Sequence, residues 1–200
     1  MELTTIHTIG DSHCQNGWRD LHLPMLKIKM NWQGPKTMHG VATNGLKNLA
    51  KACDVGDGEI VVFSYGEIDC RCHIHKHGGI ASAQELAEKY LDAVASCREL
   101  HGGNPIVWIQ GIIPPPRKAE GKDNPNMPFE GTDEERLAYT NAMNVALISG
   151  CVSRGFIFID LPREYADDVG FLDHSKSDGH VHIGSSDGLA KLVCELLNRE

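Results

Sequence analysis

The stretch EIVVFSYG at residues 59–66 is nearly continuous in β-branched and aromatic residues. Two later runs share this composition, PIVWIQGI at 105–112 and GFIFID at 155–160. Runs of this kind are typical of strands whose two faces are both covered, as in a parallel sheet between helices. Two further apolar runs, LTTIHTIG at 3–10 and LKIKMNW at 26–32, complete a predicted set of five strands.

Helical patterns separate these strands. Two of the patterns open with a hydroxyl residue and a glutamate three positions later, Ser82 with Glu85 and Thr132 with Glu135, which is the spacing of a capping box. Alternating strands and helices predict an α/β fold, a three-layer α/β/α sandwich with a mainly parallel five-stranded sheet in the flavodoxin-like order 2-1-3-4-5. We expect a single domain over residues 1–200. The predicted helices cover residues 44–53, 82–101, 132–150 and 186–198.

Composition limits the partners and the compartment. The formal net charge of -8 argues against a nucleic-acid or anionic-membrane partner, since both attract basic surfaces. No apolar run reaches transmembrane length, and the N-terminus lacks the pattern of a signal peptide. The seven cysteines are odd in number and scattered, which favours free thiols in a reducing compartment. We therefore expect a cytoplasmic protein with no membrane partner.

The first strand ends in IGDSHC, residues 9–14, which places Ser12 directly after it. Ligand sites of parallel α/β sheets lie at the carboxyl ends of the strands. A serine hydroxyl becomes a nucleophile only beside an imidazole that takes its proton, and that imidazole needs a carboxylate to orient it. Gly-Asp-Ser alone is common in turns, so the rest of the chain has to supply these partners.

With its order of short blocks, the chain resembles the SGNH, or GDSL-like, hydrolase superfamily. GDSH at 10–13 matches the nucleophile block, so the resemblance implies that Ser12 is the nucleophile. MHGVATNGL at 38–46 is similar to the second block, whose glycine lends an N–H to the oxyanion; Gly40 is the first choice and Gly45 the alternative. Together with the N–H of Ser12, Gly40 would form the oxyanion site.

The third block departs from the family. FSYGEID at 63–69 stands where the family has Gly-x-Asn-Asp, and Ile68 occupies the asparagine position, or Glu67 if the register slips. The side-chain amide that would be the third oxyanion donor is therefore missing. Losing such a donor costs roughly a hundred- to a thousand-fold in rate. Arg71 offers a substitute positive charge, and we expect Glu67 and Arg71 to contact substrate.

The last block of the family, Asp-x-x-His, supplies the acid and the base. KSDGHVHIG at 176–184 does not keep this spacing, because Asp178 with His182 is one residue too long and Asp178 with His180 one too short. We predict Asp178 and His182 as the catalytic pair, with His180 as the rival base and a substrate-binding residue. The run LDH at 172–174 is a weaker rival.

Four further features have competing interpretations. CRCHIHKH at 70–77 carries zinc-binding residue types that would share a face on an extended segment, but its spacing matches no closed zinc site, and pocket lining is favoured. The irregular stretch 113–131 is a wall or lid of the site or a mobile surface loop. Cys14 is more typical of packing than of catalysis. The tryptophans that could stack on a sugar but pack by default are Trp18, Trp32 and Trp108.

These features together predict a serine esterase or acyltransferase that acts on a small acyl ester through an acyl-serine intermediate. The expected substrate is a small-molecule or glycan ester, with an O-acetylated carbohydrate favoured. We expect no metal and no cofactor. One alternative is a catalytically silent descendant that binds a glycan or nucleotide-sugar in the same cleft. Another is a metal-dependent enzyme built on residues 70–77.

Overall fold

The predicted sheet is present in the computed structural model, which describes residues 3–46, 54–101, 103–121 and 124–198. Within these residues the sheet has five strands, all parallel, in the order β2-β1-β3-β4-β5. Both the fold class and the strand order are as predicted. The strands are β1 (Thr4–Gly10), β2 (Leu26–Trp32), β3 (Ile60–Ser64), β4 (Ile106–Gln110) and β5 (Ile157–Ile159).

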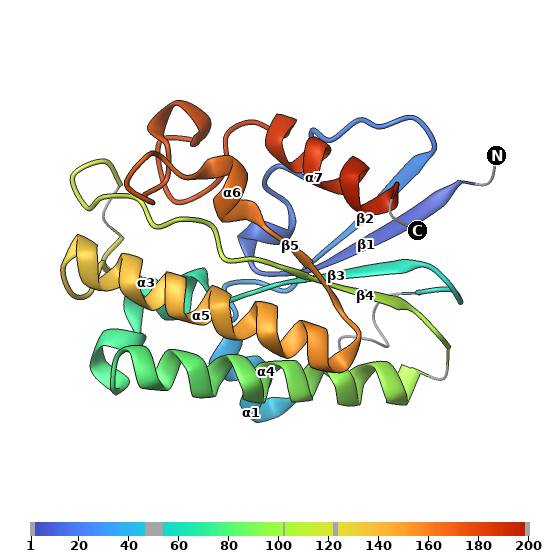
Figure 1. Cartoon of the computed structure of the whole chain (residues 1–200), viewed down its shortest axis with the longest axis horizontal. Coiled ribbons are helices and arrows are strands. Elements are labelled where there is room, and N and C mark those ends of the chain that lie inside the picture. The colour runs from blue at the N-terminus through green and yellow to red at the C-terminus, as the bar shows by residue number, and fades with distance from the viewer. Residues whose placement is uncertain (1–2, 47–53, 102, 122–123, 199–200) are drawn as a thin grey trace.

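Helices cover both faces of the sheet (Figure 1). The helices α1, α4 and α5 lie against one face, and α6 and α7 lie against the other. This is the three-layer arrangement expected from the alternation of strands and helices. The described helices are α1 (Met38–Asn44), α3 (Glu67–Cys72), α4 (Ile80–His101), α5 (Asp133–Arg154), α6 (Leu161–Tyr165) and α7 (Asp187–Leu197), with 3-10 turns η1 (Ser12–Cys14), η2 (Ile74–His77) and η3 (His174–Lys176).

Alternate residues of the central strands supply two separate cores. Val61 and Phe63 of β3 pack in the core beneath α4 and α5. Their neighbours Ile60 and Val62 pack in the second core, which includes residues of α6 and α7. Because successive side chains of a strand point to opposite faces, a strand covered on both sides must be apolar throughout. This explains why β3 lacks an alternating pattern.

The two predicted capping boxes have different outcomes. Thr132 caps α5 as expected: its Oγ1 accepts from Glu135 N at 3.2 Å, and its own N–H donates to Glu135 Oε2 at 2.7 Å. The prediction that Ser82 begins a helix is wrong. Helix α4 begins two residues earlier, at Ile80, and the Ser82 hydroxyl donates back to the carbonyl of Gly79 at 3.0 Å.

The connections between β2, β3 and α4 also differ from the prediction. Most of the short helix predicted at 44–53 falls on residues 47–53, which lie outside the described residues. The described chain instead has α1 at Met38–Asn44, just before that stretch. The run at 70–77 is helical, in α3 and η2, so the expectation of an extended segment there is wrong.

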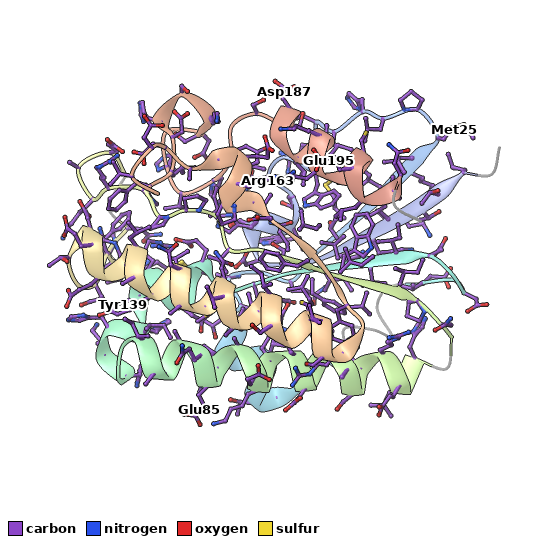
Figure 2. All side chains as sticks on the ribbon, in the orientation of Figure 1. Met25, Glu85, Tyr139, Arg163, Asp187 and Glu195 are labelled. Carbon is purple, nitrogen blue, oxygen red and sulfur yellow. The ribbon has the colours of Figure 1, made fainter. Side chains whose placement is uncertain are left out.

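The helices on the second face are joined by charged side chains. Figure 2 shows Arg163 of α6 beside Glu195 of α7, where Arg163 Nη2 donates to Glu195 Oε2 at 2.8 Å. In the described part of the chain, no helix combines the length and apolar character that crossing a bilayer requires. The loops that follow the strands gather on the left of Figure 1, away from the labelled N-terminus. The functional groups described next lie on these loops.

Candidate active site

The turn after β1 places Ser12 at the carboxyl edge of the sheet. The N–H of Asp11 donates to the carbonyl of Ser64 at the end of β3 (3.3 Å), and Asp11 Oδ1 accepts from His13 N at 2.9 Å. A side chain at Gly10 would stand 2.0 Å from the Ser64 carbonyl oxygen, so only glycine allows the two strands this approach. Ser12 therefore begins a short 3-10 turn that the neighbouring strand holds in place.

Asp178, His182 and Ser12 form a continuous chain of hydrogen bonds. His182 Nδ1 lies 2.8 Å from Asp178 Oδ2, and His182 Nε2 lies 2.9 Å from Ser12 Oγ. The structure thus brings together the three residues predicted as catalytic, although the acid and the base are four residues apart. His180 takes another position: its backbone N–H donates to Asp178 Oδ1 at 2.8 Å, and its side chain lines the nearby cleft.

A closed loop explains how the long spacing still fits. The N–H of Asp178 donates to the carbonyl of His182 at 3.0 Å, and Gly179 between them has a φ of +81°. This left-handed conformation favours glycine. The chain therefore doubles back within five residues and returns the imidazole of His182 to the carboxylate of Asp178. A second N–H, that of His182, also donates to Asp178 Oδ1, at 3.2 Å.

The surroundings of His182 favour its neutral form. Burial lowers the pKa of His182 below its ordinary value, the neighbouring His13 lowers it further, and Asp178 opposes both. Burial raises the pKa of Asp178, but its hydrogen bond and charge interaction with His182 outweigh burial and leave that pKa below its ordinary value. An ionised carboxylate on Nδ1 leaves Nε2 free to accept a proton from Ser12.

The glycine predicted to serve the oxyanion has its N–H engaged in a helix cap. The N–H of Gly40 lies in the first turn of α1 and donates to Thr37 Oγ1 at 2.9 Å, as part of the helix cap. The helix cap therefore occupies the N–H that the resemblance assigned to the oxyanion. The alternative, Gly45, is bonded as well, since its N–H donates to the carbonyl of Val41 at 2.8 Å.

Another glycine lies at the cleft itself. Gly34, between the cleft residues Trp32 and Pro35, has a φ of +77° and open space around its α-carbon.

Both residues that the resemblance offers for the asparagine position, Ile68 and the alternative Glu67, line the cleft. The next residue, Asp69, is fully buried and accepts from the N–H groups of Met38 and His39 at 2.6 and 3.1 Å. Burial raises the pKa of Asp69 to about 6, against the opposing effect of these two bonds. Asp69 therefore links the start of α1 to α3 by hydrogen bonds, and it is not among the residues that line the cleft.

Glu67 and Arg71 lie in the cleft wall but are paired with each other. Arg71 Nε and Nη2 donate to the two carboxylate oxygens of Glu67 at 2.5 and 3.1 Å, and both side chains are buried. Burial raises the pKa of Glu67, but its interactions with His13 and Arg71 dominate and lower it to about 2. The predicted contact of Glu67 and Arg71 with substrate therefore competes with this internal ion pair.

The loop at 113–131 forms a wall of the site. Arg71 Nη1 donates to the carbonyl of Met127, and the N–H of Glu130 donates to the carbonyl of Arg71 at 2.9 Å. The ring of Phe129 lies between two guanidinium groups, 5.5 Å from Arg71 and 5.0 Å from Arg136. Of the alternatives for this loop, the described residues support a wall that is anchored beside the cleft.

An open cleft of about 470 Å³ begins at Ser12, a size suited to a small organic ligand. Trp32 stands at this cleft with 55% of its surface exposed, whereas Trp18 and Trp108 are buried in the core. The lining combines apolar and polar side chains from the turn after β1, the end of β2 and the loop after it, helix α3, the loop after β4 and the loop before α7. It consists of Ser12, Trp32, Pro35, Glu67, Ile68, Arg71, Asn124, Pro125, Met127, His180, Val181 and His182.

The cysteine- and histidine-rich run at 70–77 is the basis of the metal-dependent alternative. Among the described residues, no group of three His, Cys, Asp or Glu side chains is arranged to hold a metal ion. Cys70 and Cys72 are buried, and burial raises the pKa of their thiols. His75 instead contacts the hydroxyl of Tyr139 at 3.0 Å. Cys14 is also buried, as expected of a packing residue, and none of the six described cysteines forms a disulfide.

Sequence reasoning missed His13 as a site residue. Its ring is buried and lies against the ring of His182, with 4.8 Å between the ring centres. The available signal was its place next to Ser12 in GDSH, but position alone does not show which way a side chain turns.

Several solved structures with a similar fold are named as esterases or lipases. A GDSL-like lipase from Bacteroides thetaiotaomicron is 12% identical, with a TM-score of 0.59 over 98% of this chain and 88% of that one. An aryl esterase from M. smegmatis is 13% identical, with a TM-score of 0.63 over 98% and 97%. A carbohydrate acetylesterase from Sinorhizobium meliloti is 15% identical, with a TM-score of 0.58 over 98% and 97%.

No family model matches the sequence, and no curated relative matches it either. The similarity is therefore one of structure. The chain has the fold of the GDSL-like, or SGNH, hydrolases, and the predicted resemblance is confirmed at the level of the fold.

Proposed function

We propose that the protein is a serine esterase that cleaves a small acyl ester through an acyl-Ser12 intermediate. The observation that carries this proposal is the hydrogen-bonded chain from Asp178 through His182 to Ser12, with contacts of 2.8 and 2.9 Å. The esterases and lipases that share the fold support hydrolysis as the reaction class. Ser12 is the nucleophile, His182 the general base and Asp178 the residue that orients it.

In the first half of the reaction, His182 Nε2 takes the proton of Ser12 Oγ while Oγ bonds to the ester carbonyl carbon. The negative charge of the tetrahedral intermediate lies on the former carbonyl oxygen. The N–H of Ser12, for which the described residues provide no acceptor, is available to that oxygen. His182 then passes its proton to the leaving alcohol, which departs and leaves the acyl group on Ser12.

In the second half, His182 Nε2 takes a proton from water as the water oxygen bonds to the acyl carbon. The bond from that carbon to Ser12 Oγ then breaks, Oγ takes the proton back from His182, and the carboxylic acid leaves. A sugar hydroxyl in place of water would give acyl transfer by the same steps. With Ile68 at the asparagine position and the N–H of Gly40 in a helix cap, a second oxyanion donor has to come from elsewhere. We assign this role to the N–H of Gly34, since its neighbours Trp32 and Pro35 both line the cleft.

The cleft favours an acylated carbohydrate as the substrate. Trp32 is largely exposed on the cleft that Ser12 also lines, and an exposed indole face is suited to stack on a sugar ring. His180 and Asn124 offer polar groups to hydroxyls on the same cleft. The carbohydrate acetylesterase with this fold acts on such esters by its name, which supports the choice.

Labelling with a small fluorophosphonate, read by intact mass and peptide mapping, tests the mechanism. We expect one label per chain at Ser12, loss of labelling in Ser12→Ala and His182→Gln, and labelling retained in His180→Gln. Equal loss in both histidine variants would contradict the assignment of the base. A native chain that stays unlabelled would overturn the esterase proposal and favour a silent carbohydrate-binding descendant. The isoleucine at position 68, in place of an asparagine that could donate to the oxyanion, is consistent with such a descendant.

The substrate class needs a separate test. Trp32→Ala should raise KM for an acetylated disaccharide about three- to ten-fold, because a stacking contact contributes about 0.5–1.5 kcal/mol. The value of kcat should change less than KM, since Trp32 does not touch the reacting atoms in this assignment. Trp32→Phe, which keeps a ring, is the matched control and should recover most of the loss. An unchanged KM in Trp32→Ala would remove the stacking role.

A further inference from the structure

His13 is a buried histidine that the proposed reaction does not use. It follows Ser12 directly, is 6% exposed, and packs its ring on that of His182 with 4.8 Å between centres and 48° between planes. Among the described residues, its Nε2 has no hydrogen-bond partner. A buried imidazole in contact with the general base is well placed to act on that base.

Carboxylates around His13 favour its charged form. Glu67 Oε2 lies 3.7 Å from His13 Nε2, a distance that makes the contact an ion pair and not a hydrogen bond. On the other side, Asp11 accepts the backbone N–H of His13. Burial lowers the pKa of His13, but the neighbouring Glu67 and Asp11 together outweigh burial and raise it above its ordinary value.

The charged cluster extends from His13 into the wall of the cleft. Glu67 is held by Arg71, and Arg71 donates to the carbonyl of Met127 in the loop at 113–131. Burial raises the pKa of Asp11 to about 6, and its Oδ2 has no hydrogen-bond partner among the described residues. Removing His13 would still leave Glu67 paired with Arg71, so the cluster does not depend on His13 to avoid an isolated buried charge.

We propose that His13 is a positioning residue whose buried imidazolium packs on His182, holds the base against Ser12 and keeps it unprotonated. This inference rests on the proposed function only in taking His182 as the base. The charged groups that face the two rings are Glu67, Asp11 and Arg71 around His13, and Asp178 with Glu67 around His182. A hydrolase with this arrangement retains a neutral base, and so its activity, in mildly acidic solution.

Two variants separate the charge of His13 from its packing. His13→Phe keeps a ring against His182 without the charge, and His13→Gln keeps a polar group near Glu67 without ring or charge. A unit charge at about 5 Å, partly screened by solvent, should shift the pKa of His182 by about one unit. We therefore expect the pKa of His182 to rise by about one unit in both variants.

The test is a titration of the histidine Cε1–H signals by NMR, with native His13 and His182 assigned through their variants. The native protein alone gives the first result: His13 should titrate above pH 6.5 and His182 below it. His22→Gln, a change at an exposed histidine away from the cleft, is the control and should leave both unchanged. A native His13 that is neutral at pH 6.5, or a His182 that moves by less than 0.3 units in both variants, would overturn the proposal.

Fluorophosphonate labelling of the same variants between pH 5 and 8 separates this inference from the proposed function. We expect His13→Phe to label about three- to eight-fold more slowly than the native protein at pH 5.5, as a one-unit rise in the pKa of the base requires, and at a similar rate at pH 8. A purely structural role would slow labelling equally at both. If the pKa of His182 shifts in the variants but the native protein is not labelled, the inference on His13 is supported and the esterase proposal is overturned. If the native protein is labelled but the pKa of His182 does not shift, the esterase proposal is supported and the inference on His13 is overturned.

Discussion

Replacing Asp178 by asparagine should force His182 into the wrong tautomer. Asp178 Oδ1 accepts two backbone N–H groups, those of His180 and His182, at 2.8 and 3.2 Å. In Asp178→Asn the side-chain amide oxygen must accept these two backbone N–H groups, because an NH₂ group in that place would face two other hydrogen-bond donors. The NH₂ group is then directed at His182 Nδ1, which has to accept, and the ring proton moves to Nε2. Nε2 faces Ser12 Oγ and can no longer take its proton.

The size of the loss follows from this geometry. The same change in serine proteases costs about 10⁴-fold in kcat. Here the side chain of Asp178 is 33% exposed, so water can partly replace the carboxylate at Nδ1. We therefore expect a loss of about 10³-fold in the rate of fluorophosphonate labelling and in kcat/KM, equivalent to about 4 kcal/mol of transition-state stabilisation. Folding stability should change much less, since both backbone donors keep their acceptor.

The assay is labelling of Ser12 at pH 7.5 under pseudo-first-order conditions, together with hydrolysis of a small acetyl ester. Asp173→Asn is the matched control, because Asp173 lies on the same loop and bonds Ser175 without contacting His182. It should stay within about two-fold of the native rate. A loss of less than ten-fold in Asp178→Asn, or an equal loss in Asp173→Asn, would refute the tautomer reasoning.

Three more predictions concern other parts of the chain. Because burial and His13 lower the pKa of His182, the labelling rate should rise with pH to half its maximum below pH 6.5, and a midpoint above 7 would contradict this. Thr132→Ala removes the capping box of α5 and should cost about 1–2 kcal/mol in urea unfolding at unchanged labelling; no change in the midpoint would argue against the cap. Gly10→Ala places a methyl group against the carbonyl of Ser64 and should cost about 3 kcal/mol, so a variant of native stability would contradict the close approach of β1 and β3.

The layered fold was predictable because its signals are local. The continuous apolar runs of β3 and β4 follow from burial on both faces. The pair Thr132 and Glu135, three positions apart, indicates the start of α5. The same motif at Ser82 failed for a local reason as well. Helix α4 already begins at Ile80, so Ser82 lies within its first turn, and its hydroxyl bonds back to the carbonyl of Gly79 just before the helix.

The candidate site was predictable only in part. Ser12 could be placed from its strand, and Asp178 and His182 could be named, but their spacing fits no simple rule of sequence. The fit depends on the left-handed backbone at Gly179 and on the bond from Asp178 N to His182 O. Gly40 was assigned from a block of sequence, and its N–H belongs instead to the cap formed by Thr37.

The sequence by itself determined the elements and their order, because strand and helix patterns arise from the chemistry of neighbouring residues. It also singled out Ser12 as the candidate nucleophile, since Ser12 follows the first strand in a block that resembles the GDSL-like nucleophile block. Only the tertiary structure decided which histidine meets Ser12, and that Glu67 pairs with Arg71 and His13. Those contacts join residues from loops far apart in the chain, and their charge states depend on burial and on neighbours that exist only once the sheet has brought its loops together.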